Sequence, residues 1–557
     1  MKTALYAINS KYVHSSLAVW YLSASLSEAG YSCEVLEGSI NESDEVIYKR
    51  AAEACADIYA FSCYIWNIEQ AALCAKKIKE HNSSAITVFG GPEAGYRAAD
   101  IFEKYPFVDY VISGEGEEPL LSLVSDITSG TDVTVKDGIS RRGKISAPYI
   151  MRKDPPCPYT KEYLSRLLGR IAYIETSRGC PFLCAYCMSS KQKLRFFDTE
   201  RAKRDIITLA NSSTETVKFV DRTFNADRGR AHELFAFIIS EREKNNIPAG
   251  VTFHFEIAGE LVDEKTLELL KTAPAGLFQF EIGVQSFNPK TLSAINRHTD
   301  TEKLCRVIQK LYSYGNIHIH TDLIAGLPYE DKESFAASYN KLFSLGAHKL
   351  QLGFLKLLHG SDMREMPELF PCEYRKEPPY TVKSTPWLSE DDIRELELCE
   401  RASDGIFFSG RFVSTAKYLL DCCGMDPYTL AKTLGEALYS GDTPALDELY
   451  NSIYDLCSQM DGVRADILRD RLLYDRIANN NSCVIPKHLI IRDKNLKHIS
   501  KRVEELFPKQ KNVRRCVGIL YTEGTVIFAD YDKKHPVTGL YNVHKISKSI
   551  LFEGEEI

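Results

Sequence analysis

Short apolar runs alternate with helical segments along most of this 557-residue chain, and no other feature limits its fold as strongly. Strands that alternate with helices build parallel sheets covered on both faces. The alternation forms two series, separated by residues 129–168, where periodicity is weak and a linker is expected. Because one hydrophobic core cannot serve so long a chain, the sequence predicts several domains, two of them α/β.

The first series, residues 1–128, predicts a doubly wound, flavodoxin-like parallel sheet. We expect strands at Thr3–Ile8, Ser32–Leu36, Asp57–Tyr64, Ala85–Gly91 and Tyr110–Ser113, with helices such as Leu17–Glu28 and Glu69–Lys79 between them. Four strand ends lead into small or polar residues, at Asn9–Lys11, Ser62–Cys63, Gly90–Glu93 and Gly114–Glu117. Glycines can simply end strands, but ligands of such sheets bind at this edge, and four such ends favour a ligand site.

The second series, residues 169–358, predicts a partial (β/α)6 barrel. Its expected strands are Ile171–Thr176, Val217–Asp221, Thr252–Ile257, Phe278–Gln285, Ile317–Ile324 and Lys349–Leu355. Helices are expected between them, at Arg201–Ala210, Arg230–Lys244 and Lys303–Tyr314. In such barrels the chemistry lies at the carboxyl ends of the strands.

Residues 359–557 predict a mostly helical C-terminal domain with a few terminal strands. Helices are expected at Glu390–Glu400, Thr429–Leu438 and Leu446–Gln459, and strands at Val517–Tyr521 and Thr525–Asp530. The segment Lys487–Arg515 holds ten Lys and Arg against three Asp and Glu. Such an excess could grip phosphates or a nucleic acid backbone, but a solvated charged helix is favoured.

Three cysteines follow the first barrel strand with the spacing C-x3-C-x2-C: Cys180, Cys184 and Cys187. Three thiolates on one loop can hold three irons of a [4Fe–4S] cluster and leave the fourth iron open. Structural zinc usually takes four ligands in paired Cys-x2-Cys units, and no second pair follows. Chance clustering is the other alternative in a chain with 16 cysteines. Placement at the end of a barrel strand favours the cluster.

At these residues the chain resembles the radical S-adenosylmethionine (SAM) superfamily, in the branch with an N-terminal cobalamin-binding-like domain and an uncharacterised C-terminal domain. The open iron would then chelate SAM, and one electron from the cluster would release a 5′-deoxyadenosyl radical. The resemblance implies SAM contacts at Tyr186 (adenine), Glu256 and Asp322 (ribose), Gln285 in a GVQ-x-F-N-like segment, and Arg297 (methionine carboxylate). The chain departs from the family at the second barrel strand, where Asp221 replaces a "GGE"-like segment as the expected partner of the methionine amine.

The cobalamin prediction rests on the strand-end loops of residues 1–128. Cobalamin mutases carry D-x-H-x-x-G after the first strand, whereas this chain reads Tyr12-Val-His14-Ser-Ser-Leu17, and Leu17 is expected to crowd a buried nucleotide tail. The resembling branch lacks that motif and leaves the lower cobalt face unligated or bound by water, so a bound cobalamin and a retained but empty domain both stay open. The candidate contacts are Tyr12, His14, Ser62, Trp66, Gly90, Gly91, Glu93, Gly114 and Glu115.

Three functions follow from the resemblance. The first is an oxygen-sensitive enzyme that abstracts hydrogen and methylates an unactivated carbon with the help of cobalamin. The second is a radical lyase that releases the base from a modified nucleoside or nucleotide, as in queuosine salvage. The third is a non-catalytic cobalamin or cluster sensor. The resemblance assigns SAM contacts but no catalytic residue, so no catalytic residue is predicted.

Composition limits the classes of partner that we expect for this chain. The formal net charge of −7 gives no global basic field for nucleic acid. No apolar run approaches a membrane span, and a cysteine-rich chain without a signal peptide is expected in the reducing cytoplasm. We expect a small-molecule or modified-nucleoside substrate and a flavodoxin- or ferredoxin-type electron donor.

Overall fold

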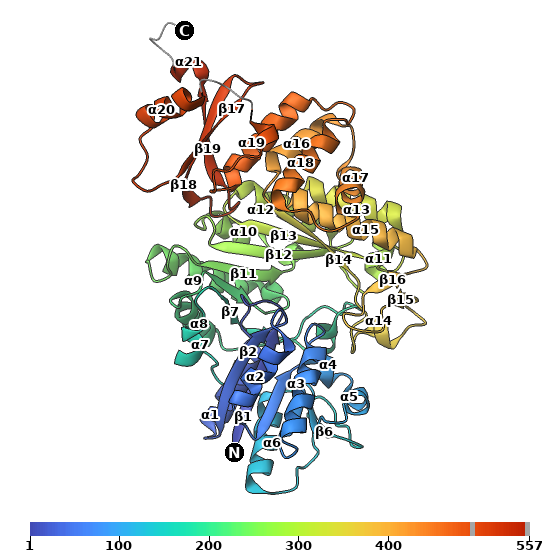
Figure 1. The fold of residues 1–557 in the computed structure, drawn as a ribbon. Helices are drawn as coiled ribbons and strands as arrows, with labels where there is room; N and C mark the ends of the chain where they lie inside the picture. The colour runs from blue at the N-terminus through green and yellow to red at the C-terminus, as the bar shows by residue number, and fades with distance from the viewer. Residues whose placement is uncertain (491–495, 552–557) are drawn as a thin grey trace. The chain divides into compact units, whose positions relative to one another are not determined.

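The computed structural model describes residues 1–490 and 496–551 (Figure 1). It divides into two compact units, each built from several stretches of chain. Unit 1 holds Met1–Thr272, Ile295–Arg297 and Lys356–Val382, and unit 2 holds Ala273–Ala294, His298–Leu355 and Lys383–Ile557. The basic segment Lys487–Arg515 lies partly outside the described residues.

The N-terminal sheet of unit 1 has the strand order β2-β1-β3-β4-β5-β6. Its strands are β1 (Lys2–Asn9), β2 (Ser32–Ser39), β3 (Ile58–Ser62), β4 (Ile86–Gly90), β5 (Tyr110–Ile112) and β6 (Ile139–Arg141). The first five are parallel, in the order of flavodoxin-like folds, and this confirms the predicted doubly wound sheet. The sixth strand, β6, is antiparallel and comes from the predicted linker.

Helices cover both faces of this sheet (Figure 1). One face packs on α2 (Asp44–Glu53), α3 (Ile68–His81) and α5 (Ala98–Lys104) through a shared apolar core. The other face carries α1 (Leu17–Glu28) and α6 (Glu117–Ser129), which pack against each other. Alternate residues of the strands therefore point into two different layers.

Unit 1 also contains three parallel strands of the second series, in the order β11-β10-β7. These elements are β7 (Ile171–Ile174), β10 (Thr216–Phe219) and β11 (Thr252–Ile257), with α8 (Thr199–Ala210) and α9 (Arg228–Glu243). A short antiparallel ribbon, β8 (Ser177–Arg178) with β9 (Arg195–Phe196), follows β7. Smaller elements of this unit are α4 (Pro92–Gly95), α7 (Lys161–Ser165), α10 (Glu264–Lys271), α14 (Asp362–Glu365) and β15 (Glu373–Tyr374). The strand β16 (Val382–Ser384) begins in unit 1 and ends in unit 2.

Unit 2 contains three further parallel strands in the order β14-β13-β12. They are β12 (Phe278–Gln285), β13 (His318–Ala325) and β14 (Lys349–Phe354), with α11 (Pro289–Ala294), α12 (Thr301–Tyr314) and α13 (Lys332–Ser344). Units 1 and 2 thus supply the six parallel strands predicted for a partial barrel, in the predicted chain order.

The C-terminal part of unit 2 is mostly helical, as predicted. Its helices are α15 (Glu390–Ala402), α16 (Val413–Cys422), α17 (Pro427–Tyr439), α18 (Leu446–Cys457), α19 (Ala465–Asn479), α20 (Leu496–Leu506) and α21 (Lys548–Leu551). A three-stranded antiparallel sheet follows, with β17 (Arg515–Leu520), β18 (Thr525–Lys534) and β19 (Tyr541–Ser547). Residues of α19 pack on one face of this sheet, and residues of α20 pack on the other.

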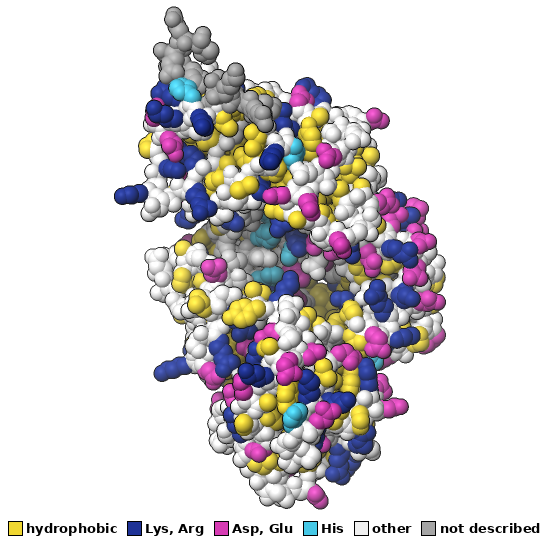
Figure 2. Space-filling view, in the orientation of Figure 1, with side chains coloured by type: hydrophobic (Ala, Val, Ile, Leu, Met, Phe, Trp, Pro, Cys, Tyr) yellow, Lys and Arg dark blue, Asp and Glu magenta, His cyan; other side chains and the backbone are white. Residues whose placement is uncertain are grey.

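Charged side chains of both signs are interspersed over the face shown in Figure 2, as expected for 69 Lys and Arg against 76 Asp and Glu. Among the helices that the structure describes, none has the length and apolar content needed to cross a bilayer.

Candidate functional site

A cavity of about 790 Å³ opens in unit 1 at the carboxyl ends of the N-terminal strands. Loops after β1, β3, β4 and β5 line one side, and residues that follow β7 and β10 line the other. The second side includes residues that flank the three cysteines, namely Gly179, Met188, Ser189, Lys191 and Gln192. One cavity therefore adjoins both the predicted cobalamin loops and the predicted cluster loop.

The structure places most of the cobalamin candidates at this cavity. The residues that line it are His14, Ser62, Trp66, Gly90, Gly91, Gly114 and Glu115. Two candidates lie elsewhere. Tyr12 is 72% exposed, with its ring beside the Arg170 guanidinium. Glu93 is buried away from the cavity lining, where the Tyr380 hydroxyl donates to it and Arg97 pairs with it at 2.5 Å.

An apolar slot extends from the cavity along the face of the sheet that carries α1 and α6. The strand residues Ala60, Val88 and Ile112 line its floor, and residues of the two helices, including Leu17 and Leu120, line its walls. Leu17 was expected to crowd a nucleotide tail. The slot is nevertheless present, because the strands that line it contribute small or branched side chains. Gly116, the residue before α6, also lines the cavity and has no side chain to fill it.

Two stacked aromatic rings face the cavity after β3. The rings of Tyr64 and Trp66 lie 4.4 Å apart and are almost parallel, and Trp66 Nε1 donates to the Ile8 carbonyl at 3.3 Å. The hydrogen bond fixes the indole, so the pair forms a rigid, flat platform. A flat macrocycle such as a corrin could rest on it.

The three cysteines lie on a loop closed at its base by the β8–β9 ribbon. Gly179 has a φ of +84°, and a Cβ there would come within 2.6 Å of the Gln192 and Lys193 carbonyls, so only glycine fits. The Ala185 amide donates to the Ile295 carbonyl at 3.0 Å. All three thiols are free of disulfides.

Polar groups surround the thiols. The Thr223 hydroxyl lies 3.5 Å from Cys180 Sγ, and Arg297 Nη1 lies 3.8 Å from Cys184 Sγ. Within residues 1–490 and 496–551, no three His, Cys, Asp or Glu side chains converge as ligands of a single metal ion. Three thiols on one loop are nevertheless the donor set that a [4Fe–4S] cluster takes, since each thiolate binds a different iron.

Asp221 lies beneath the cysteine loop. Its carboxylate accepts hydrogen bonds from the Thr176 amide at 3.0 Å, the Thr176 hydroxyl at 2.7 Å and the Ser177 hydroxyl at 2.6 Å. Burial raises the pKa of Asp221, and these donors oppose the rise. Its carboxylate oxygens thus hold the start of the loop, and its contact with SAM stays a prediction.

The other predicted SAM residues lie on both units. In unit 1, Glu256 is on β11 with the Lys218 ammonium 3.8 Å away, and Tyr186 is part of the cysteine loop near Arg297. In unit 2, Gln285 ends β12 with a φ of +71°, an unusual conformation for a residue with a side chain, and Asp322 pairs with Gly283 on the neighbouring strand. Outliers of this kind cluster at functional sites.

The sequence analysis did not single out Arg178. In the chain this residue follows Ser177, which donates a hydrogen bond to Asp221, and precedes the first cysteine. Its guanidinium binds three carboxylates: Nη1 donates to Glu115 at 3.0 Å, Nη2 donates to Glu117 at 2.6 Å, and Nε and Nη2 both donate to Glu175. Burial raises the pKa of Glu175, and Arg178 opposes the rise. The Glu-rich strand-end loop and an arginine next to the cysteines were the signals that could have suggested this pairing.

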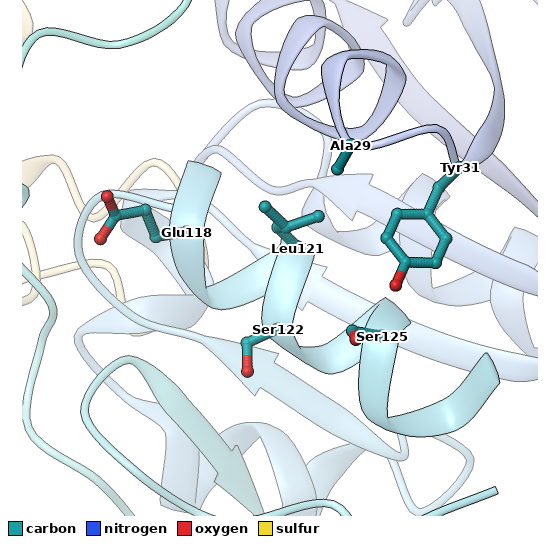
Figure 3. Close-up of a pocket in the computed structure, with 6 residues that line it drawn as sticks. All are labelled: Ala29, Tyr31, Glu118, Leu121, Ser122 and Ser125. Atoms are coloured by element: carbon teal, nitrogen blue, oxygen red, sulfur yellow. The ribbon is translucent and has the colours of Figure 1, made fainter. Parts of the chain in front are cut away.

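A second hollow, of about 370 Å³, lies at the turn after α1 and along α6 (Figure 3). Its lining residues are Ala29, Tyr31, Glu118, Leu121, Ser122 and Ser125. The Tyr149 hydroxyl already donates to Glu118, the only carboxylate in this lining. None of the predicted site residues lines it.

Three family models match consecutive parts of the chain. The B12 binding domain matches residues 3–124, the radical SAM superfamily matches residues 174–342, and a protein of unknown function, DUF4080, matches residues 368–525.

Curated relatives match at low identity. The 2-(S-pantetheinyl)-carbapenam-3-carboxylate methyltransferase of Streptantibioticus cattleyicolor is 29% identical over 314 residues, which are 53% of this chain and 46% of that protein. The cobalamin-dependent radical SAM methyltransferase TokK of Streptomyces tokunonensis is 27% identical over 393 residues, 66% of this chain and 57% of TokK. The matched segment spans about half the length of these curated relatives.

Solved structures share the fold. OxsB, a cobalamin-dependent SAM radical enzyme solved with aqua-cobalamin and SAM, superposes with a TM-score of 0.60 at 15% identity and covers 92% of this chain and 82% of its own. The radical SAM methyltransferase TsrM of Kitasatospora setae, solved with cobalamin and a [4Fe–4S] cluster, gives a TM-score of 0.55 at 18% identity over 66% of this chain and 74% of its own.

Proposed function

We propose that this chain, which joins a B12-binding domain to a radical SAM domain and a C-terminal domain of unknown function, is a cobalamin-dependent radical SAM enzyme that methylates an unactivated carbon. The domains confirm the predicted cofactors: a [4Fe–4S] cluster and SAM for one, cobalamin for the other. Methylation is supported by relatives whose names describe methyltransferases. The lyase and the sensor have no such support among the relatives named above.

The observation that carries the proposal is the shared cavity. Its lining joins the strand-end loops of the B12-binding domain to residues that flank the cysteines, namely Gly179, Met188, Ser189, Lys191 and Gln192. A methyl donor and a radical source must reach the same substrate carbon, so a methylase needs both cofactors at one cavity. A lyase that used the radical alone would not need the apolar slot between α1 and α6.

The residues present fit cobalamin. The stacked pair of Tyr64 and Trp66 offers a flat apolar surface to a corrin, and the slot over Ala60 and Val88 offers an apolar space to the benzimidazole of a nucleotide tail. Gly90, Gly91, Gly114 and Gly116 carry no side chain, so the backbone at these positions can approach the corrin amides closely.

The residues around the cysteines fit the cluster and SAM. Cys180, Cys184 and Cys187 would ligate three irons, and Arg297 would place positive charge beside the cluster and toward the methionine carboxylate. Glu256 and Asp322 are the proposed ribose acceptors, Gln285 and Tyr186 the proposed contacts to the rest of the nucleoside. When bound, the cluster and SAM supply a hydrogen-abstracting radical and cobalamin supplies a methyl group.

Partners follow from this chemistry. The one-electron reduction calls for a flavodoxin- or ferredoxin-type donor, and the substrate is proposed to be a small molecule or a modified nucleoside. The cytoplasmic location stays a prediction, and contact with nucleic acid, which the sequence did not favour, is not proposed.

The test is anaerobic reconstitution with iron, sulfide and hydroxocobalamin, followed by product analysis with SAM and reductant. We expect corrin absorbance that persists through gel filtration, and formation of both S-adenosylhomocysteine and 5′-deoxyadenosine in step with methylated product. Two SAM molecules are then used per product, one for the radical and one to restore the methyl donor. Turnover that proceeds without cobalamin and yields no S-adenosylhomocysteine would overturn the methylase and support the lyase.

A further inference from the structure

One carboxylate of the B12-binding domain grips both strands that close the cysteine loop. Glu115 Oε2 accepts from Arg178 Nη1 at 3.0 Å and from Arg195 Nη2 at 3.0 Å, and Oε1 accepts from Arg195 Nη2 at 3.2 Å. Arg178 and Arg195 are paired residues of the β8–β9 ribbon. The side chains of Glu115 and Arg178 are 10% and 12% exposed, so water screens this contact weakly.

The loop that carries Glu115 is held in a fixed position. Gly114 has a φ of +84°, and a Cβ there would meet the Tyr149 carbonyl oxygen at 2.2 Å. The Glu115 amide donates to the same carbonyl at 2.9 Å, and the Met151 amide donates to Glu115 Oε2 at 3.1 Å. A shift of residues 113–117 therefore carries the Glu115 carboxylate with it.

The same residues border the ligand space. Gly114, Glu115, Glu117, Arg178 and Gly179 all line the large cavity. A corrin that presses on residues 114–117 would thus act on Glu115, and through its two arginines on the ribbon that positions Cys180. No carboxylate of the β1, β3 or β4 loops makes such a contact with both ribbon strands within residues 1–490 and 496–551.

We propose that Glu115 is a positioning residue that couples the filling of the cobalamin cavity to the geometry of the cluster loop. The inference rests on the proposed function, because it takes cobalamin as the occupant of the cavity. Coupling between two sites is reciprocal. The factor by which a bound cluster increases the affinity for cobalamin must therefore equal the factor by which bound cobalamin increases the affinity for the cluster. Glu115, which the sequence suggested as a direct cobalamin contact, acts here through Arg178 and Arg195.

The test measures that factor. Hydroxocobalamin affinity is determined anaerobically for cluster-loaded and cluster-free protein, in the wild type, in Glu115→Gln and in Glu118→Gln. Glutamine keeps the size of the side chain but removes the charge that holds both arginines. Glu118 is the matched control, since it lies three residues further along, in the first turn of α6, and its contacts are Tyr149 and Lys153 rather than the ribbon.

For the wild type and Glu118→Gln, we expect cluster-loaded protein to bind hydroxocobalamin roughly tenfold more tightly than cluster-free protein, within the usual range of coupling between sites. For Glu115→Gln the ratio should fall to within about twofold of one. Amide exchange of residues 177–196 in cluster-loaded protein provides a second readout. Hydroxocobalamin should slow it in the wild type and the control but not in Glu115→Gln, a difference that general loss of stability would not produce.

If Glu115→Gln does not fold, Arg178→Lys replaces it, since lysine keeps the charge but cannot bridge three carboxylates. A wild-type ratio near one, or a Glu115→Gln variant that keeps the wild-type ratio and exchange response, overturns the coupling while cobalamin still binds. A wild-type protein that binds no hydroxocobalamin overturns the proposed function together with this inference.

Discussion

His14 Nδ1 lies 2.7 Å from the hydroxyl of Tyr173, a contact between the loop after β1 and the strand β7, which leads into the cysteine loop. Burial is the main cause that lowers the pKa of His14, with Lys11, Lys218 and Arg170 adding to it, so the imidazole is neutral at pH 7. Burial raises the pKa of Tyr173 to about 12, which keeps its hydroxyl protonated. We expect this hydroxyl to donate to Nδ1, which puts the imidazole proton on Nε2 and removes the lone pair that cobalt would need.

His14→Ala should therefore leave cobalt coordination unchanged and alter cobalamin affinity by less than about threefold, because only one neutral hydrogen bond is lost. The electron paramagnetic resonance spectrum of the cob(II)alamin-loaded protein checks this. Nitrogen splitting from an axial ligand should be absent in the wild type. Splitting that is present in the wild type and lost in His14→Ala would show that His14 ligates cobalt.

Replacing Cys180, Cys184 or Cys187 with Ala should abolish the cluster and all SAM cleavage. Two thiolates cannot hold a cubane that leaves one iron open for SAM. Iron, sulfide and 5′-deoxyadenosine are the measurements, with Cys157→Ala as the control because this exposed cysteine lies outside the loop. A triple variant that retained about four irons per chain would contradict the assignment.

Four single alanine variants should each bind SAM more weakly, by about 1–3 kcal/mol, and keep the cluster absorbance. The residues changed are Glu256, Gln285, Arg297 and Asp322. Isothermal titration with SAM on reconstituted protein gives the numbers. Asp221→Ala should behave differently and lower cluster content first, because its carboxylate holds Thr176 and Ser177 at the start of the loop. Wild-type SAM affinity in all four variants would disprove the proposed contacts.

Ala18→Trp should lower the affinity for cobalamin at least roughly tenfold without unfolding the domain. Ala18 lines the cavity on α1 yet is exposed, so an indole there fills ligand space rather than the core. Absorbance titration with hydroxocobalamin measures the effect. Val46→Trp is the control, since Val46 is 46% exposed and lies on α2, over the opposite face of the sheet. Equal affinity in both variants would show that cobalamin does not occupy the cavity beside Ala18.

Glu330 predicts a pH dependence of stability in unit 2. It is fully buried, and the Ser286 and Ser338 hydroxyls both donate to Oε1 at 2.6 and 3.3 Å. Burial raises its pKa from the usual 4.5 to about 7. A raised pKa means that the native state favours the protonated acid, so the stabilisation is complete below about pH 4.5 and is lost as pH rises through 7.

Glu330→Gln keeps the Oε1 acceptor and removes the charge. Its thermal midpoint should match the wild type at pH 5 and exceed it by roughly 5 °C at pH 8, from a difference of about 3 kcal/mol at most. Differential scanning calorimetry at the two pH values decides. The same offset at both pH values would mean that Glu330 does not titrate in this range.

The strands whose apolar residues recur regularly over six or more positions were predictable from the sequence, and short or largely exposed strands were not. The bounds of Thr252–Ile257 and Phe278–Gln285 agree with β11 and β12, because these strands are buried over most of their length. The edge strands β6 and β19 were missed. The first has three residues, and the second is exposed at most positions, so neither carries a strong hydrophobic period.

Loop side chains were the least predictable part of the site. A strand pattern locates the carboxyl end of a strand, but the next two or three backbone torsions decide where each side chain points. Glu93 enters the helix α4 and is held by Tyr380, which lies almost 300 residues further along the chain. Such a partner is set by tertiary packing, which no local pattern contains. The cysteine spacing, in contrast, is a local pattern, so the cluster prediction could be made directly from the sequence.

The radical SAM family match ends at residue 342, but the chain returns to unit 1 at Lys356–Val382. There the Met363 amide donates to the Ala185 carbonyl at 3.0 Å, and Asp362 pairs with Lys191. Both contacts support the cysteine loop from outside the matched segment. Residues 174–342 are therefore not self-sufficient: transplanting them into another protein would leave the cysteine loop without these two contacts. Exchanging the C-terminal part of the chain would preserve the contacts only with a junction beyond Met363.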